Sequence, residues 1–245
     1  MVPQLKTTDN PQIIYPDSDG KPMADNTKQF RWIVVIQQNL EWLFADDANV
    51  FVAGDLLWYP VEGNNSLCTA PDVMVIFGRP KGDRGSYQQW REDQIAPQVV
   101  FEILSPGNTR TEMDKKLVFY SRYGVEEYYL YDPDRNDLSG WLRNENGLDV
   151  IDPIANWVSP RLGIRFDIAG AVLRLLRPDG EPFASYTVTA QQLQQAEANV
   201  EQERQRAEQE RQRAEQERQR AEQERQRAER LAERLRAAGI DPEAG

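Results

Sequence analysis

Two acidic residues stand where apolar strands are expected. Glu102 lies inside Val99–Leu104, a stretch that is otherwise apolar on both faces, as in a central strand covered on both sides. An ionised carboxylate in such a strand costs several kcal/mol unless it is paired or bound to a metal. Asp72 follows Pro71 and opens a second apolar stretch, Val73–Phe77. Two carboxylates at the ends of adjacent strands can hold one hard cation and leave positions for water and a phosphate oxygen.

Each of these residues also has a purely structural interpretation. Glu102 could lie on an edge strand or form a structural salt bridge, and Asp72 could simply belong to a Pro-Asp turn. The two together are more informative than either alone, because a shared site explains both.

The composition restricts the chemistry to oxygen and amine groups. The 245 residues include no histidine and one cysteine, Cys68, so catalytic triads, Cys-His pairs, imidazole-ligated zinc and intramolecular disulfides are excluded. Carboxylate, lysine, hydroxyl and backbone groups remain. Any metal is therefore expected to be a hard cation held by oxygen, Mg²⁺ or Mn²⁺.

A helix expected after Glu102 carries Glu112, Asp114, Lys115 and Lys116. Glu112 and Lys116 are four residues apart and share a face, so they could form an ordinary helix pair. In the functional interpretation one lysine leans over the metal site. There its charge can stabilise a pentavalent phosphate or lower the pKa of an attacking water.

Positive charge and aromatic rings alternate in one loop, over residues 79–91, where Asp83 is the only acid. Such a loop suits a phosphate backbone and a stacked base, although an ordinary solvated loop has the same composition. The whole chain has 40 acidic and 29 basic residues and a net charge of -11. Binding of nucleic acid therefore requires the few bases of the main domain to cluster. The candidate nucleic-acid-binding residues are Arg79, Lys81, Arg84, Trp90 and Arg91, with Arg110 from a second basic segment.

Hydrophobic periodicity predicts the elements that must position these residues. The expected order is a helix, three strands, a helix and a strand, followed by a β-rich extension, which is a mixed α/β (α+β) domain. Helices are expected from a cap at Asp25, Asn26 or Thr27 to Phe44, and over Thr111–Arg122 with Gly124 after it. The expected strands are Val50–Trp58, Val73–Phe77, Val99–Leu104, Glu127–Tyr131, Leu138–Arg143, Leu148–Ile151, Gly163–Ile168 and Val172–Leu176, with a polar loop from Gly78 to Pro97.

The C-terminal part is a repeat. The unit EQERQRA occurs four times without a change, over residues 201–228, and helix-forming sequence continues to Gly239. Residues 191–245 hold 13 acidic and 11 basic residues, so most of the net charge belongs to the rest of the chain. We predict an extended arm over residues 1–26, a globular domain over 27–188, a charged helix over 189–239 and a tail over 240–245.

The sequence leaves open whether the repeat helix is solitary. Its seven-residue period suits a coiled coil, and one heptad column runs from Leu193 through four alanines to Leu235. The column three positions later contains four glutamates, which make a poor seam for residues 191–238. Glu208–Arg211 and Arg211–Glu215 pairs within one helix are the alternative. A weak homo-oligomer and a solvated single helix are both compatible with the pattern.

The spacing of the acidic residues resembles a known family. Pro71-Asp72 stands thirty residues before Glu102 in VVFEILSPGNT, and the helix sequence MDKKLVFYSRYGVEEYYLYDP follows. The E-I-L-S-P and K-x-x-x-Y-x-x-x-G-V-x-E-Y-Y patterns resemble a large bacterial family of restriction-endonuclease-like proteins in the PD-(D/E)xK nuclease superfamily. The resemblance covers about residues 25–170. It implies a restriction-endonuclease-like core of helix, three strands, helix and strand.

The sequence departs from the superfamily pattern at Leu104, where a lysine usually follows the glutamate by two residues. In the family resembled, the lysine comes from the next helix, and Lys116 lines up with it, beside Lys115. The resemblance implies that Asp72, Glu102 and the Ile103 carbonyl are metal ligands and that Lys116 stabilises charge. Further candidates for an additional acid near the metal are Asp55 and Glu41.

These observations predict a Mg²⁺- or Mn²⁺-dependent endodeoxyribonuclease that hydrolyses DNA with a metal-activated water. Two other functions stay open: an inactive nuclease fold that assembles partners through its C-terminal helix, and a hydrolase of another phosphate ester. The sequence has no long apolar run and no basic N-terminal segment followed by an apolar one, so we expect a cytoplasmic protein without a membrane span.

Overall fold

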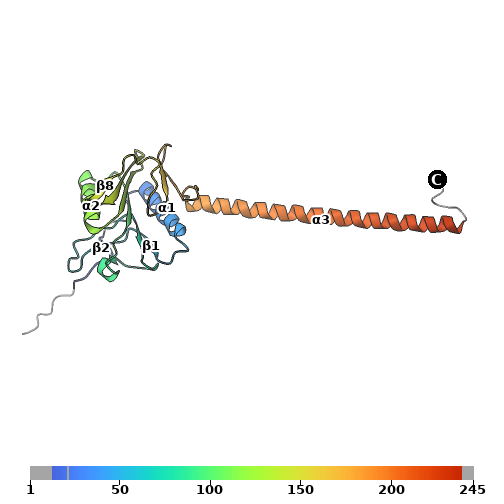
Figure 1. The fold of residues 1–245 in the computed structure, drawn as a ribbon, viewed down its shortest axis with the longest axis horizontal. Helices are drawn as coiled ribbons and strands as arrows, with labels where there is room; N and C mark the ends of the chain where they lie inside the picture. The colour runs from blue at the N-terminus through green and yellow to red at the C-terminus, as the bar shows by residue number, and fades with distance from the viewer. Residues whose placement is uncertain (1–12, 21, 239–245) are drawn as a thin grey trace, which may run out of the picture. The chain divides into compact units, whose positions relative to one another are not determined.

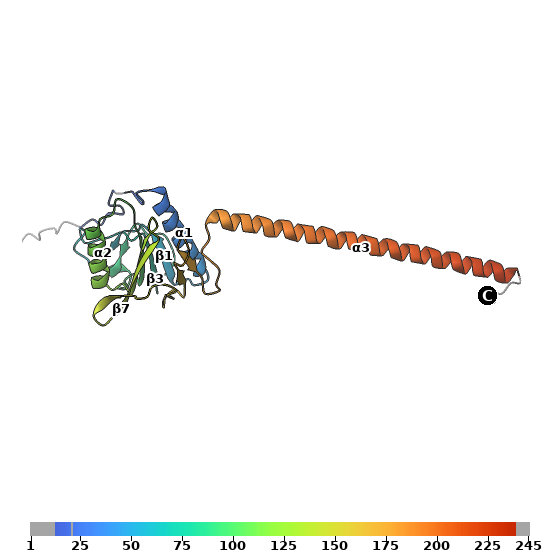
Figure 2. The same cartoon turned by 90° about the horizontal axis from the view of Figure 1, so that it is seen from above.

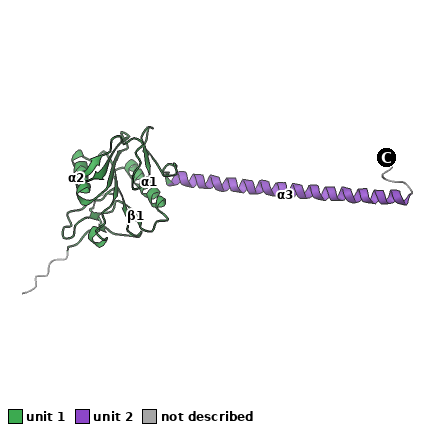
Figure 3. Cartoon of the chain, in the orientation of Figure 1, with its two compact units in different colours: residues 1–185 green, residues 186–245 purple. Residues whose placement is uncertain are grey.

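The computed structural model describes residues 13–20 and 22–238. Part of the predicted arm, residues 1–12 and 21, lies outside the described residues, as do Gly239 at the end of the predicted helix and the whole predicted tail, 240–245. The chain divides into two compact units, residues 1–185 and 186–245, which Figure 3 colours separately. Unit 1 contains every residue to which the sequence assigns chemistry.

Unit 1 is built on a six-stranded mixed sheet. Its strands are ordered β1-β3-β5-β6-β7-β8, and neighbours are antiparallel except for the parallel pair β5 and β6. The first helix, three sheet strands, second helix and next sheet strand follow one another along the chain as predicted. The strand bounds are β1 Val50–Gly54, β3 Val73–Phe77, β5 Val99–Ile103, β6 Glu127–Asp132, β7 Asp137–Asn144 and β8 Gly147–Val150.

Two helices cover opposite faces of this sheet (Figures 1 and 2). Helix α1, Thr27–Leu43, begins at an Asn26 cap. Helix α2, Arg110–Tyr123, begins with a Thr109–Glu112 capping box and ends at Gly124, whose φ of 99° is left-handed. Because side chains alternate along a strand, each strand supplies two separate apolar layers. In β5, the α1 layer takes Val99, Phe101 and Ile103, and the α2 layer takes Val100.

The expected strand Val50–Trp58 is wrong as a single element. It divides into β1 and a short strand β2, Trp58–Tyr59. The break falls at Asp55, which has a left-handed φ of 49° and whose N–H lies within hydrogen-bonding reach of the carbonyls of Pro71 and Asp72. Aspartate tolerates this conformation better than most residues. Apolar residues continue beyond the break, so hydrophobicity alone does not reveal it.

The remaining elements refine the prediction. The expected polar loop Gly78–Pro97 contains a short strand β4, Tyr87–Gln88, parallel to β2, and a 3-10 helix η1, Gln89–Arg91. The last two expected strands are shorter than predicted. They are β9, Arg165–Asp167, and β10, Arg174–Leu176, which form a separate two-stranded sheet.

Unit 2 is the helix α3, Tyr186–Ala237, which is 52 residues long and begins three residues before the predicted start. It has no buried residue among those described. Side-chain hydrogen bonds link successive turns of the repeat, as between Gln205 and Glu201 at 3.0 Å. Arg225 lies 3.8 Å from the carboxylate of Glu222 and 3.5 Å from that of Glu229. Whether α3 also pairs with another copy stays a prediction. In the described ranges, no helix combines the length and apolar character needed to cross a membrane.

Candidate functional site

The register of the sheet places three carboxylates side by side. Val73 on β3 lies opposite Phe101 on β5 and opposite Gly54 on β1. The neighbouring positions, Asp72, Glu102 and Asp55, are therefore adjacent across the three strands. Alternation along the strands directs all three toward the face covered by α2. Two of them, Asp72 and Glu102, are the pair that the sequence singled out.

Glu102 is a buried carboxylate with a charged partner. Its side chain is 3% exposed, and it lies on the central strand β5 rather than at an edge. The Lys116 ammonium donates to both carboxylate oxygens, at 2.7 Å each, and the Tyr120 hydroxyl donates to one of them. Burial lowers the pKa of Lys116, but the negative charges of Glu102 and Asp72 outweigh it and raise the pKa overall.

Asp72 is held less favourably. One of its carboxylate oxygens accepts the backbone N–H of Ile103 at 2.6 Å, which fixes the side chain beside β5. Burial, followed by the negative charge of Glu102, raises the pKa of Asp72 to about 8. Asp72 is thus largely protonated at neutral pH, and a cation at the site would favour its ionised form.

The two further acids behave differently. Burial, followed by the negative charge of Asp19, raises the pKa of Asp55. The positive charge of Lys116 acts on the same carboxyl and lowers its pKa. Asp55 therefore belongs to the same cluster. Glu41 instead lies on α1, where its carboxylate accepts a 2.9 Å bond from Lys81. It is not among the described residues that line the cavity beside Asp72.

A cavity of about 520 Å³ opens onto this cluster. Asp55 and Asp72 line it from the sheet, and Lys115 and Lys116 line it from α2. Segments before α1 and after β2 complete its wall. The other lining residues are Asp19, Pro22, Met23, Ala24, Asp25, Gln29, Leu57, Cys68, Thr69, Ala70, Asn108, Glu112 and Met113.

The donor set suits a hard cation that keeps much of its water. Asp72, Glu102 and the Ile103 carbonyl are oxygen donors, and Mg²⁺ is commonly held by one or two carboxylates with water and substrate oxygens completing its shell. Gln29 already donates a 2.9 Å bond to the Ile103 carbonyl, which retains a second lone pair. No cluster of three or more potential metal-ligating Asp, Glu, His or Cys side chains occurs among residues 13–20 and 22–238.

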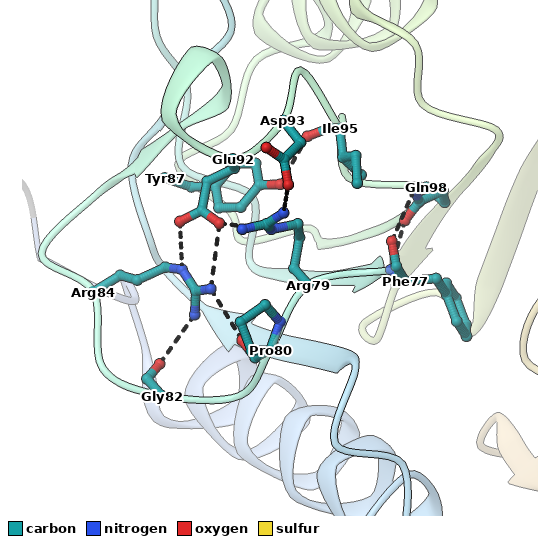
Figure 4. Close-up of polar contacts among 10 residues, drawn as sticks. All are labelled: Phe77, Arg79, Pro80, Gly82, Arg84, Tyr87, Glu92, Asp93, Ile95 and Gln98. Atoms are coloured by element: carbon teal, nitrogen blue, oxygen red, sulfur yellow. Dashed lines mark hydrogen bonds and ion pairs between the residues drawn. The ribbon is translucent and has the colours of Figure 1, made fainter.

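The predicted nucleic-acid-binding loop is neutralised by acids just beyond it (Figure 4). Glu92 accepts bonds from Arg79 and Arg84, each at 2.8 Å, and Asp93 also accepts a bond from Arg79. The Arg84 guanidinium lies over the Phe51 ring at 4.0 Å. These two arginines thus support the loop itself.

The other candidates in this group lie at the surface or in small contacts. Lys81 pairs with Glu41, and the Trp90 ring packs against Tyr15 at 4.8 Å. Arg91 is exposed, and Arg110, also exposed, lies 4.0 Å from Asp114. Binding of nucleic acid by any of them stays a prediction.

Two tyrosines near Glu102 were missed from the sequence. Tyr120 is fully buried, and burial followed by the Glu102 charge raises its pKa well above the usual value. Tyr128 has a raised pKa for the same two reasons, and its hydroxyl has no hydrogen-bond partner in the described part of the chain. The spacing of Lys116 and Tyr120, four residues apart on one helix face, was the available signal.

A family model and a solved structure are similar to this chain. The sequence model of the Uma2 family, described as "Putative restriction endonuclease", matches residues 20–169. A similar solved structure is described as "a putative nuclease belonging to DUF820 from Anabaena variabilis ATCC 29413". It has 20% identity and a TM-score of 0.46, over 60% of this chain and 81% of that chain. No curated protein matches the chain.

Proposed function

Because the chain belongs to the Uma2 family of restriction-endonuclease-like proteins, we propose that it is a divalent-cation-dependent endodeoxyribonuclease. The observation that carries this proposal is the placement of Glu102. It is a buried carboxylate on the central strand, adjacent to Asp72 and bonded through both oxygens to Lys116, and these two neighbours line a cavity open to a ligand. A structural ion pair alone requires neither the second carboxylate nor the cavity.

Asp72, Glu102 and the Ile103 carbonyl are the groups that would hold Mg²⁺ or Mn²⁺. When bound there, such a cation supplies a Lewis acid for the phosphate oxygens and lowers the pKa of a water. The Ile103 N–H keeps Asp72 oriented through its 2.6 Å bond. Ile103 therefore positions one proposed metal ligand, Asp72, and supplies another through its carbonyl. Gln29 donates to the carbonyl of the same residue and orients that group.

Lys116 supplies the positive charge of the site. Its ammonium lies between Glu102 and the cavity that it lines, and its raised pKa keeps it protonated at neutral pH. A lysine in this position can stabilise negative charge that develops on a phosphate oxygen. Tyr120, one turn along α2 from Lys116, also donates to Glu102 and limits the rotation of the carboxylate.

DNA is the proposed substrate. Its phosphate backbone is expected to lie near exposed basic side chains. Lys115 lines the cavity beside Lys116, and Arg110 and Arg91 are exposed. Few cations lie at the site, so we expect weak binding that depends moderately on salt, since each phosphate contact adds to the salt slope.

The test is cleavage of plasmid and single-stranded DNA by the full chain with Mg²⁺ or Mn²⁺. Asp72→Asn and Glu102→Gln keep the size of each side chain and remove its charge. Both should reduce cleavage to background. Asp46→Asn, at an exposed carboxyl just beyond α1, is the matched control and should retain the parent rate.

Cleavage that persists at the parent rate in both site variants would overturn the proposal. Calorimetric titration with Mn²⁺ gives a readout without DNA: binding should be present in the parent chain and lost in Glu102→Gln. If the parent chain binds no divalent cation and cuts no DNA, the nuclease fold serves another purpose.

A further inference from the structure

The chain before α1 forms a strap over unit 1 that is fixed at both ends. We use "strap" for residues 15–20 and 22–25. At its first end, the Tyr15 ring packs between Tyr59, at 5.2 Å, and Trp90, at 4.8 Å. The Tyr15 hydroxyl accepts the Gly63 N–H at 2.6 Å, and the Pro16 carbonyl accepts the Tyr59 hydroxyl at 2.8 Å. This end is thus held by both packing and hydrogen bonds.

The second end of the strap is tied to the site strand. The Ser105 hydroxyl donates to the Asp25 carboxylate. The Asp25 N–H donates to Gln29 at 2.8 Å, and Gln29 in turn donates to the Ile103 carbonyl at 2.9 Å. A displacement of Asp25 would therefore act on Ile103, the residue whose N–H holds Asp72.

Between its ends, the strap walls the cavity above the carboxylates. The strap residues that line it are Asp19, Pro22, Met23, Ala24 and Asp25. Asp72 is 8% exposed and Glu102 is 3% exposed, so a phosphodiester must enter this cavity to reach them. Its volume of about 520 Å³ corresponds to a ligand of nucleotide size.

A DNA duplex is poorly suited to such an entrance. It is stiff, with a persistence length of about 150 base pairs, so it does not bend locally beneath a tied segment without a cost in free energy. An unpaired strand can turn one nucleotide inward. Enzymes that reach buried atoms of nucleic acid commonly act on single strands for this reason.

The charge of the strap also disfavours binding of a duplex. Three acids, Asp17, Asp19 and Asp25, outnumber Lys21, the one base in the sequence from 15 to 25, and Asp19 raises the pKa of Asp55 at the cavity wall. A duplex carries one negative charge per about 1.7 Å of its axis, twice the density of one strand. The acidic strap therefore repels a duplex more strongly than it repels an unpaired strand.

We propose that the strap makes this site selective for single-stranded DNA, a selectivity that rests on the proposed nuclease function. Tyr15 is the residue that sets it, because it secures the end of the strap that is not attached to the site strand. The strap excludes the duplex by its position and charge and takes no part in bond cleavage.

The experiment compares one labelled oligonucleotide, alone and annealed to its complement, as substrates for the full chain with Mn²⁺. The single strand should be cut at least about tenfold faster. Tyr15→Ala removes the ring contacts and the hydroxyl of the first anchor. It should raise the rate on the duplex about tenfold and leave the rate on the single strand unchanged. Tyr186→Ala, at a tyrosine that is 77% exposed, is the matched control and should alter neither rate.

A second variant protects the test against loss of folding. Asn65 lies in an exposed turn and donates a 2.9 Å bond to the Ile14 carbonyl, next to the strap. Asn65→Ala loosens the same end without touching the core. It should shift the ratio of the two rates in the same direction by a smaller factor, at an unchanged unfolding temperature.

The outcomes separate the two proposals. If the parent chain cuts the duplex as fast as the single strand, and both reactions require Asp72, the selectivity is overturned and the nuclease function stands. If neither substrate is cut, both proposals are overturned. If Tyr15→Ala and Asn65→Ala leave the ratio of the two rates unchanged, the strap does not set selectivity.

Discussion

Glu102 and Glu127 lie on β5 and β6, the parallel pair of the sheet, and both are buried, at 3% and 0% exposure. Their surroundings differ. Glu102 faces a lysine, a tyrosine and a second carboxylate beside a cavity. Glu127 accepts bonds from the Tyr129 hydroxyl at 2.9 Å, the Arg161 N–H at 2.7 Å and the Ser159 hydroxyl.

The difference shows that a buried carboxylate by itself does not mark a site. Neutral donors satisfy Glu127, which packs on the α1 side of the sheet with Tyr129 and borders none of the cavities described. Glu102 is instead paired with the Lys116 ammonium and shares its surroundings with Asp72. An incompletely balanced group of charges beside open space can act on a ligand, whereas a closed hydrogen-bond set can only stabilise the fold.

The comparison is tested most strongly by making the same substitution in both places. Glu102→Gln should lower cleavage by about 10³-fold or more, because it removes the charge of a carboxylate proposed to hold the cation. Glu127→Gln should keep the parent rate within about threefold, which is a change of less than 1 kcal/mol. Single-turnover cleavage of DNA with Mn²⁺ measures both. Equal losses in the two variants would mean that the glutamates have the same role.

The next test removes the cation near each glutamate. Lys116→Met should reduce cleavage about 10²–10³-fold, because no other side chain in the described part of the chain donates to both oxygens of Glu102. Arg161→Met should have little effect, since Arg161 reaches Glu127 through its backbone N–H while its side chain pairs with Glu126. The KM of the Lys116 variant indicates whether the lysine also binds the substrate. Full activity in Lys116→Met would assign the charge to Lys115.

Regular periodicity made much of the fold predictable from the sequence. The strand Val73–Phe77 has its predicted bounds, and the capping residue Asn26 and Gly124 after α2 are both where they were expected. The β1–β2 break was not predictable from apolar pattern, because it depends on Asp55 taking a left-handed conformation stabilised by carbonyls from a distant turn. The pairing of β2 with β4 likewise depends on contacts that are far apart in sequence.

Residues of the candidate site were predictable where a single acidic residue stood in or beside an apolar strand. Glu102 and Asp72 stood out against apolar neighbours, and Lys116 was found through the resemblance to a family. Tyr120 was missed because a tyrosine on an amphipathic helix is usually a core residue. The pairing of Arg79 and Arg84 with Glu92 was also missed, since Glu92 lies just beyond the predicted basic loop, residues 79–91. The cavity and the strap require the packed structure.

Substitutions beside Glu127 and beside Glu102 should change the free energy of unfolding in opposite directions. Ser159→Ala removes one donor from buried Glu127 and should lower the free energy of unfolding by about 1–3 kcal/mol. Asp72→Asn removes a carboxyl whose ionisation is opposed by burial and by Glu102, and in the absence of divalent cations it should raise that free energy by about 1 kcal/mol. Urea unfolding in the presence of a chelator measures both. A loss of stability in Asp72→Asn would mean that the carboxylates at the site are already balanced.

The smallest expected effect is a change with pH at Glu127. Burial raises the pKa of this carboxyl above its ordinary value of 4.5, although three donors act in the other direction. The folded chain thus retains this proton at a pH where the unfolded chain has lost it. The resulting stabilisation is complete below the ordinary pKa and is lost as pH rises through the raised value.

Glu127→Gln removes this dependence while the Arg161 N–H keeps its acceptor and the two hydroxyls can turn to accept from the new amide. Between about pH 4 and the raised pKa, the stability of the parent chain should fall relative to the variant by at most about 1.4 kcal/mol per pH unit. Urea titrations at several pH values give the two slopes. Parallel slopes would mean that the donors hold Glu127 ionised throughout, so that only the neighbouring cation and the cavity distinguish Glu102 from it.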